Sequence, residues 1–439
     1  MEQTAALNRP AETAAVTPSR PVISEDWLAV GIGALLIMLV LAGVRPATAR
    51  FAWATAGDLA SVFSADNLAR SLQLGILLMI PAAGGALLLG ARLGTFVAGF
   101  SILYVLAWIA QALAGYAGSS ALGLEYVIYA LVIGLVVGYV APLKRRFAAA
   151  VQAEYYIKIG LVILGASVIF GQLIEAGLLG VSQAIVVVLA VWFVCYRLCK
   201  WCKVDDELAT MLSAAVSICG VSAAIAVCGA IQGDRKKLSY VSSLVLVVAV
   251  PMMIVMPWIS RATGMPEVVA GAWLGGTLDT SAAVVAAGEL VSEQARNAAV
   301  VVKLSQNVLI GVAAFALTVW WAMRRTDRVD QPKASASVIW ERFPKFVLGF
   351  LLVSFVFSFA LSDQIVADTR GALTAMRTAW FALAFVAIGL ETSLGELVST
   401  GEGRPAIAFL GGQAFNIVLT LAMAYLLFGG ILFPAPSFN

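Results

Sequence analysis

Long apolar stretches alternate with short polar connections along most of the chain. An apolar run of about 20 residues can cross the roughly 30 Å hydrocarbon core of a bilayer as a helix. Eleven stretches have this character, and we expect each to form a transmembrane helix: 27–44, 71–90, 94–114, 122–141, 155–173, 179–198, 239–259, 297–322, 346–362, 373–390 and 405–430. The pattern therefore predicts an all-α, polytopic membrane protein.

Two further stretches, 207–231 and 266–290, are apolar but repeatedly interrupted by Gly, Ser and Thr. Basic clusters flank the first of them, at 197–203 and 235–237. Because Lys and Arg in short loops favour the cytoplasm, a single crossing would place one cluster on the wrong side. A re-entrant hairpin keeps both clusters in the cytoplasm, together with the N-terminus. By the same parity the second stretch enters from the outside, and discontinuous crossing helices are the alternative.

Internal similarities favour two halves of opposite orientation. Gly220–Gly229 resembles Asp279–Gly288, and Gly165–Gly177 resembles Gly389–Gly401. In the expected topology, each pair enters the membrane from opposite sides, which is typical of an inverted-repeat transporter. The alternative is chance, because small residues are common in membrane helices.

Composition supports the membrane assignment and removes several functions. Of 439 residues, 61% are hydrophobic and 12% charged, whereas soluble domains carry about 25% charged residues. The net charge of +3 gives no reason to expect nucleic acid. Histidine is absent, which excludes His-based zinc sites and Ser-His or Cys-His nucleophiles. We expect no metal site, no cofactor and no enzymatic activity.

The chain divides into a short tail and one large domain. Residues 1–22 are rich in Ala, Thr and Pro, and we expect a disordered cytoplasmic tail there. Residues 23–439 then form a single transmembrane transporter domain.

The two interrupted stretches predict a polar pocket. Non-helical backbone at membrane depth is tolerated only where it is buried in protein or lines a cavity. Each break precedes a half-helix, whose N-terminus carries about half a positive charge and several free N–H groups. Two such ends suit a small oxyanion. The candidate substrate-binding residues in the breaks are Ser217, Cys219, Gly220, Ser222, Gly275, Gly276, Thr277, Thr280 and Ser281.

Two ionisable residues accompany the breaks. Asp279 is either the N-cap of the second half-helix or a ligand for a coupling ion, Na⁺ or H⁺. Lys303 lies within the run 297–322, where a lysine costs about 2.5–3.5 kcal/mol at a helix centre. Gln306 and Asn307 follow at helical spacing, so the three residues share one polar face. We add all three to the candidate substrate site, where Lys303 contacts an anion or pairs with Asp279; snorkelling to the interface is the alternative.

Three blocks carry a resemblance to a known family. Ser217–Ala226, Gly271–Gly288 and Val302–Leu309 resemble the YeiH-like family of conserved bacterial inner-membrane proteins. The similar core runs from about Leu72 to Gly401. The resemblance implies a location in the bacterial inner membrane, a proposed role in sulfate export, and distant kinship with cation–proton antiporters and bile-acid symporters.

This chain departs from the family pattern at one point. Many relatives carry a histidine in the second break, where this chain has the stretch 276–279 without one. A proton step assigned to that histidine therefore does not carry over.

The expected function is that of a secondary transporter. It would export a small anion, such as sulfate, sulfite or a small sulfonate-related acid, by alternating access. No P-loop motif is present for ATP. The alternative is an importer of a small organic acid coupled to Na⁺ or H⁺. An intramembrane enzyme and a channel are weaker alternatives, and the oligomeric state stays open, with a homodimer among the options.

Overall fold

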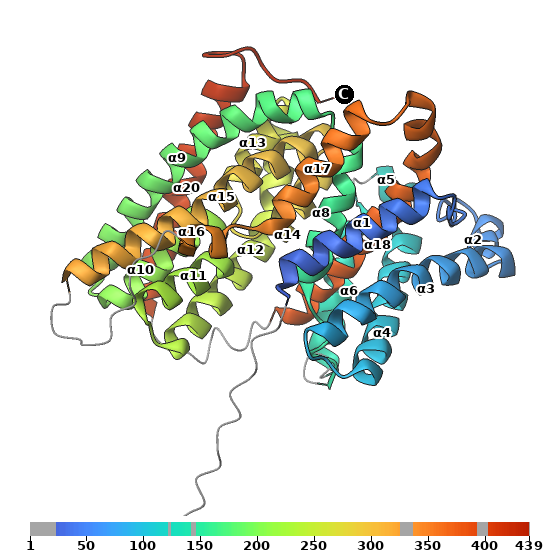
Figure 1. Ribbon diagram of the computed structural model, residues 1–439, viewed down its shortest axis with the longest axis horizontal. Helices are drawn as coiled ribbons and strands as arrows, with labels where there is room; N and C mark the ends of the chain where they lie inside the picture. Colours follow the sequence, from blue (N-terminus) through green and yellow to red (C-terminus); the bar gives the residue numbers. More distant parts are fainter. Residues whose placement is uncertain (1–22, 122–123, 142–145, 325–336, 393–402, 439) are drawn as a thin grey trace, which may run out of the picture.

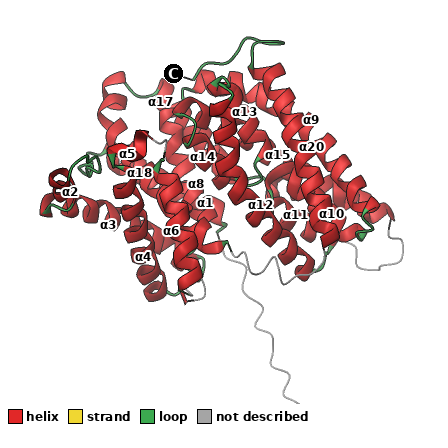
Figure 2. Ribbon diagram, turned by 180° about the vertical axis from the view of Figure 1, so that it is seen from behind, coloured by secondary structure: helices red, strands yellow, loops and turns green. Residues whose placement is uncertain are grey.

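The computed structural model describes residues 23–121, 124–141, 146–324, 337–392 and 403–438. The tail predicted at 1–22 lies outside this part of the chain. The described residues are almost entirely helical, and their only β-structure is an isolated bridge between Trp53 and Tyr116 (Figure 2). The all-α prediction is therefore confirmed.

The helices follow the predicted apolar runs closely. Their bounds are α1 Glu25–Leu41, α2 Ala56–Val62, α3 Ala65–Leu88, α4 Leu93–Ala114, α5 Ala117–Ala121, α6 Tyr126–Val140, α8 Ala153–Leu164, α9 Phe170–Trp201, α10 Asp206–Ala214, α11 Val221–Ile231, α12 Arg235–Ala262, α13 Glu267–Thr277, α14 Ser281–Glu289, α15 Glu293–Arg324, α16 Ser337–Arg342, α17 Lys345–Phe359, α18 Asp363–Glu391 and α20 Gly403–Phe428. Within the described chain, α3, α4, α9, α12, α15, α18 and α20 are long and apolar enough to cross a membrane. These helices fit a polytopic membrane protein.

One predicted helix is interrupted. The run 155–173 is divided because α8 ends at Leu164 and α9 begins at Phe170. The hydroxyl of Ser354 in α17 donates to the carbonyl of Val168, inside the break, over 2.6 Å. With 12 residues, α8 is about 18 Å long, which is shorter than the hydrocarbon core.

The helices form two bundles (Figure 1). The hairpin bundle contains α9 to α15 and α20, and α15 lies at its centre against α9, α13 and α14. The scaffold bundle contains α1, α3, α4, α6, α8, α17 and α18. Here α18 is central and packs against α4, α6 and α8. The two interrupted stretches therefore belong to the same bundle.

The second interrupted stretch is a re-entrant hairpin. Gly271, near the start of α13, and Gly288, near the end of α14, both lie against the first turn of α15. Leu278, at the tip between these helices, reaches Lys303, about two turns further along α15. The hairpin therefore begins and ends beside the first turn of α15, and its tip lies further along that helix.

The first interrupted stretch is also a hairpin. Lys237, in the first turn of α12, forms ion pairs with Asp205 and Glu207, at the start of α10, over 2.6 and 2.8 Å. The tip at Ile218 contacts Lys303. Residues of α10 and α11 form a hydrophobic cluster with the second half of α15. The two hairpins therefore enter from opposite ends of α15, as predicted, and neither is a discontinuous crossing helix. Their tips meet at Lys303.

The first internal similarity corresponds to equivalent structure. Gly220 directly precedes α11, and the matching Asp279 stands two residues before α14, so both similar blocks begin the return helix of a hairpin. The second similarity involves the stretch 393–402, which lies outside the described residues.

Candidate functional site

The tips of the two hairpins touch. A π-helical turn, Ala215–Cys219, ends at Gly220, whose φ is +61°. Residues that carry a side chain rarely adopt this backbone conformation. A Cβ at this position would lie 3.1 Å from Cβ of Asp279 and 2.7 Å from Cγ1 of Val245. Glycine is therefore required here for both conformation and space.

The carbonyl ends of the incoming helices meet at Lys303, which is only 2% exposed. Its ammonium donates to the carbonyl of Ile218 over 2.6 Å and to the carbonyl of Leu278 over 2.7 Å. A third bond, of 3.0 Å, goes to Oε1 of Gln306. Helix C-termini leave carbonyls without intrahelical partners and carry partial negative charge. Lys303 therefore satisfies both tips and ties them together.

Buried amide side chains complete this support. Gln306 donates to the carbonyl of Gly276 over 2.9 Å. In α20, Gln413 and Asn416 donate to the carbonyl of Thr277 over 3.0 and 3.2 Å. Because every buried carbonyl needs a donor, these amides allow the helix to stop inside the protein.

Sequence reasoning missed part of this support, namely Gln183 in α9 and Gln413 and Asn416 in α20. Gln183 donates to the carbonyl of Ala272 over 2.9 Å. The available signal was the spacing of Gln413 and Asn416, which places two amides on one face of an apolar run.

The amide ends of the return helices are left open. Thr280, not Asp279, is the N-cap of α14, and its hydroxyl accepts from the amide of Ala283 over 3.1 Å. No described residue accepts a hydrogen bond from the first amides of α11, those of Val221 and Ser222. These N–H groups are available to a ligand.

A cavity of about 320 Å³ leads to these amide ends. Four predicted site residues line its inner end: Cys219, Ser222, Ser281 and Asn307. The amide of Asn307 donates to the hydroxyl of Ser281 over 3.1 Å. The charged residues that line the rest of it are Glu25, Asp26, Glu154, Lys158, Glu341, Arg342 and Lys345.

The mouth of the cavity lies beside the start of α1. Lys158 forms ion pairs with Glu25 and Asp26 over 2.7 and 3.0 Å. These pairs hold α1 to α8 and neutralise much of the charge along the opening. The cavity is therefore polar but carries no strong excess of either sign.

The remaining predicted site residues do not line the cavity. They shape the two tips and pack them against neighbouring helices: Ser217, Gly220, Gly275, Gly276, Thr277, Thr280, Lys303 and Gln306. Gly275, for example, lies against the backbone of Ala299, where a Cβ would clash with the Ala299 carbonyl oxygen.

Asp279 occupies a distinct position. It is 2% exposed, and neither of its carboxylate oxygens has a hydrogen-bond partner among the described residues. The ion pairs of the described chain do not include one between Asp279 and Lys303.

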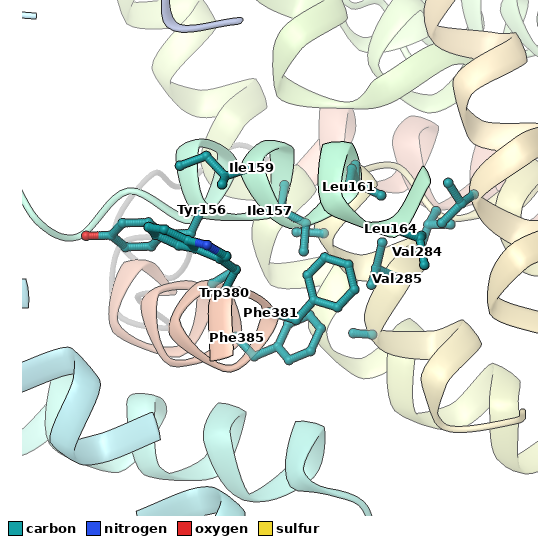
Figure 3. Packing of buried hydrophobic residues seen from close by; sticks show 14 of the residues in the cluster. Tyr156, Ile157, Ile159, Leu161, Leu164, Val284, Val285, Trp380, Phe381 and Phe385 are labelled. Atoms are coloured by element: carbon teal, nitrogen blue, oxygen red, sulfur yellow. The ribbon is translucent and has the colours of Figure 1, made fainter. Parts of the chain in front are cut away.

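On the far side of the tips the two bundles pack closely together. Figure 3 shows Val284 and Val285 of α14 beside Leu164 of α8 and Phe381 of α18. All four side chains are buried. The cavity is therefore open on the α1 side, while apolar packing separates the tips from the opposite side.

Comparisons with known proteins agree with this architecture. A family model described as "Conserved hypothetical protein 698" matches residues 98–408. The chain is 39% identical over 370 residues to a UPF0324 membrane protein of Rhodopirellula baltica, covering 81% of this chain and 67% of the relative. It is 37% identical over 401 residues to one of Nitratidesulfovibrio vulgaris, covering 86% and 68%. A third, from Nitrosomonas europaea, is 30% identical over 376 residues, covering 74% and 76%. No solved structure matches. The chain belongs to the UPF0324 family of multi-pass membrane proteins, to which the YeiH-like resemblance also pointed.

Proposed function

We propose that the protein is a secondary transporter that moves a small oxyanion, such as sulfate, sulfite or a small sulfonate-related acid, across the bacterial inner membrane without converting it chemically. The observation that carries the proposal is the end of the cavity at the open N-terminus of α11, beside that of α14. Helix N-termini bind anions through free N–H groups and the positive end of the helix dipole.

The carbonyl ends of the incoming helices and the amide ends of the return helices differ in their electrostatic character. The carbonyl ends of the incoming helices already have a cation, Lys303. The amide ends face the cavity together with the hydroxyls of Ser222 and Ser281 and the amide of Asn307. An oxyanion at this end would receive neutral donors only. Neutral donors bind without a fixed counter-charge, which favours release as well as binding.

The arrangement of the bundles suits alternating access. The hairpin bundle holds both tips, and beside them apolar side chains of α14 pack against α8 and α18 of the scaffold bundle. Tilting one bundle against the other would close the cavity beside α1 and expose the tips on the opposite side. With the N-terminus in the cytoplasm, as the basic loops predict, the cavity opens inward.

Export is the direction that the membrane potential favours. Moving one charge through 100 mV is worth about 2.3 kcal/mol. An inside-negative potential therefore drives a divalent anion outward without any coupling ion.

An importer of a small organic acid coupled to Na⁺ or H⁺ is the second candidate. The buried carboxylate of Asp279, which has no hydrogen-bond partner among the described residues, favours it. Uphill uptake driven by an imposed Na⁺ or pH gradient would identify this mode.

Transport into proteoliposomes tests the proposal. The purified protein would be assayed with labelled sulfate, sulfite and taurine-derived anions, with and without a membrane potential. We expect uptake of at least one anion, and about a tenfold or greater loss in Asn307→Leu combined with Ser222→Ala. Ser101→Ala, on the exposed face of α4, is the control. Wild-type rates in the double variant would show that the pocket is misassigned.

A further inference from the structure

Three side chains at the tip of the second hairpin have buried oxygens that accept no hydrogen bond from any described residue. These atoms are Oγ1 of Thr277, both carboxylate oxygens of Asp279 and Oε1 of Gln413. Each residue is at most 2% exposed. A buried polar atom without a partner costs roughly 1–3 kcal/mol, and native proteins contain few of them. Their concentration at one tip requires an explanation.

The three groups lie together. Nε2 of Gln413 donates to the backbone carbonyl of Thr277 over 3.0 Å. The carboxylate of Asp279 neighbours the Gln413 side chain without an aligned hydrogen bond. The bond from Nε2 also fixes the orientation of the amide, because a flipped amide would place Oε1 against the Thr277 carbonyl. Oε1 of Gln413 is therefore an acceptor by necessity.

We propose that these oxygens form a Na⁺ site, with Asp279, Thr277 and Gln413 as its side-chain ligands. Oxygen ligands suit hard cations, and interrupted helix ends are the places where transporters hold coupling ions. A single carboxylate, with the ammonium of Lys303 bonded to the adjacent Leu278, favours a monovalent ion over a divalent one. A proton on Asp279 would supply a single donor, whereas one cation can contact all of these oxygens at once.

The consequence for transport rests on the proposed function. Asp279 directly precedes Thr280, the N-cap of α14, so the Na⁺ site adjoins the helix N-terminus at which the oxyanion would bind. A bound cation offsets the negative charge of an oxyanion that is buried near the same hairpin tips. Each ion therefore strengthens the binding of the other. When both ions move together, an inward Na⁺ gradient would oppose the export that the membrane potential alone favours. Na⁺ binding itself does not depend on the identity of the anion.

Thermal unfolding of the purified full-length protein tests the site without any oxyanion. Melting temperatures would be compared in NaCl, KCl and choline chloride at equal ionic strength. We expect stabilisation that saturates with Na⁺ and is absent with K⁺ and choline, because a ligand of the folded state raises its stability. Asp279→Asn and Gln413→Leu should raise the half-saturating Na⁺ concentration by at least about tenfold.

A matched pair of isosteric variants separates ligation from packing. The hydroxyl of Thr277 has no partner among the described residues, whereas that of Thr420 donates to Asn416 over 2.8 Å. Thr277→Val should weaken the Na⁺ response and leave the melting temperature in choline unchanged or higher. Thr420→Val should lower the melting temperature in choline and keep the Na⁺ response.

Two outcomes would overturn the inference. One is a wild-type melting temperature that is equal in Na⁺, K⁺ and choline. The other is a full Na⁺ response in Thr277→Val and Gln413→Leu. A normal Na⁺ response in a protein that moves no oxyanion would contradict the proposed function and leave the Na⁺ site in place.

Discussion

At the scale of single residues, Lys303 connects the tips of the two hairpins by hydrogen bonds. Its three N–H donors all have acceptors, two of them carbonyls on different hairpins. Lys303→Met would leave both carbonyls and Gln306 without this donor. We expect a loss of about 3 kcal/mol or more in the free energy of unfolding and a clear fall in melting temperature. Lys236 is exposed in the first turn of α12, and Lys236→Met is the control. Equal melting temperatures of the two variants would show that the hydrogen bonds of Lys303 do not stabilise the hairpin tips.

Gly220 allows a second test at this scale. Gly220 and Gly264 have nearly the same φ, +61° and +62°, but a Cβ at Gly264 would meet nothing within 4 Å. Gly264→Ala should cost about 1 kcal/mol from backbone strain alone. Gly220→Ala adds the contacts with Val245 and Asp279, so its melting temperature should fall considerably further. Similar losses in the two variants would mean that the tip has room to adjust.

Single residues were predictable to the extent that their chemistry conflicts with the bilayer. Lys303 stood out because an ionisable residue in an apolar run needs a reason. The carbonyls that accept its hydrogen bonds could not be predicted, because every residue has a backbone carbonyl and the sequence does not show which of them lack a partner. Asn416 was missed because uncharged amides, even the pair that it forms with Gln413, are tolerated in a membrane helix and do not reveal which helix end they face.

At the scale of helices, the opposed hairpins were predictable from loop charge, and labelling can test their sidedness. Cysteines introduced at Arg235 and Glu293 would be exposed to a membrane-impermeant thiol reagent in intact cells and in inverted vesicles. These positions lie at the bases of the first and second hairpins. We expect labelling of 293 from outside and of 235 only from the cytoplasm. Labelling of both from one side would contradict the opposed arrangement.

The base of the first hairpin should respond to acid. Burial alone would raise the pKa of Asp205, but hydrogen bonds from Lys237 and the amide of Leu208 outweigh it and hold the pKa below its ordinary value. The carboxylate therefore stabilises the fold above about pH 4 and loses this effect as the pH falls through its pKa in the folded protein.

The variant Asp205→Asn isolates this effect, because asparagine is also a good N-cap. We expect it to melt below the wild type at pH 7, and the difference to shrink as the pH falls below about 4. Asp363→Asn in α18, far from this base, should show no such convergence. A constant difference across the pH range would assign the effect to packing instead of charge.

The division between α8 and α9 shows what helix-scale patterns miss. Apolar content continues without a gap from α8 into α9, so the run 155–173 reads as one span. The break depends on Ser354 and Ser358, which bond Val168 and Phe170 from α17. Such a partner, nearly 200 residues away, becomes visible only after folding.

At the scale of the whole molecule, the boundary between the bundles contains a buried guanidinium that forms no ion pair within the described chain. Arg377 of the scaffold bundle is 5% exposed, and its Nη1 donates to Ser167 over 3.1 Å while its Nε has no partner among the described residues. Across the boundary, Glu289 and Glu293 pair instead with Arg296, over 3.0 and 2.8 Å. The boundary therefore holds two guanidiniums and two carboxylates, and both carboxylates are paired with Arg296.

A buried charge without an ion-pair partner costs free energy in the conformation that contains it, so Arg377 favours separation of the bundles on this side. Arg377→Gln removes the charge and keeps a donor for Ser167. We expect it to raise the melting temperature, by a stabilisation on the order of 1 kcal/mol, and to slow transport in proteoliposomes because the closed boundary opens less often. Arg370→Gln, exposed on the same helix, should change neither property. If Arg377→Gln instead melted earlier at an unchanged transport rate, Arg377 would be a packing residue of the scaffold and the boundary would need another reason to open.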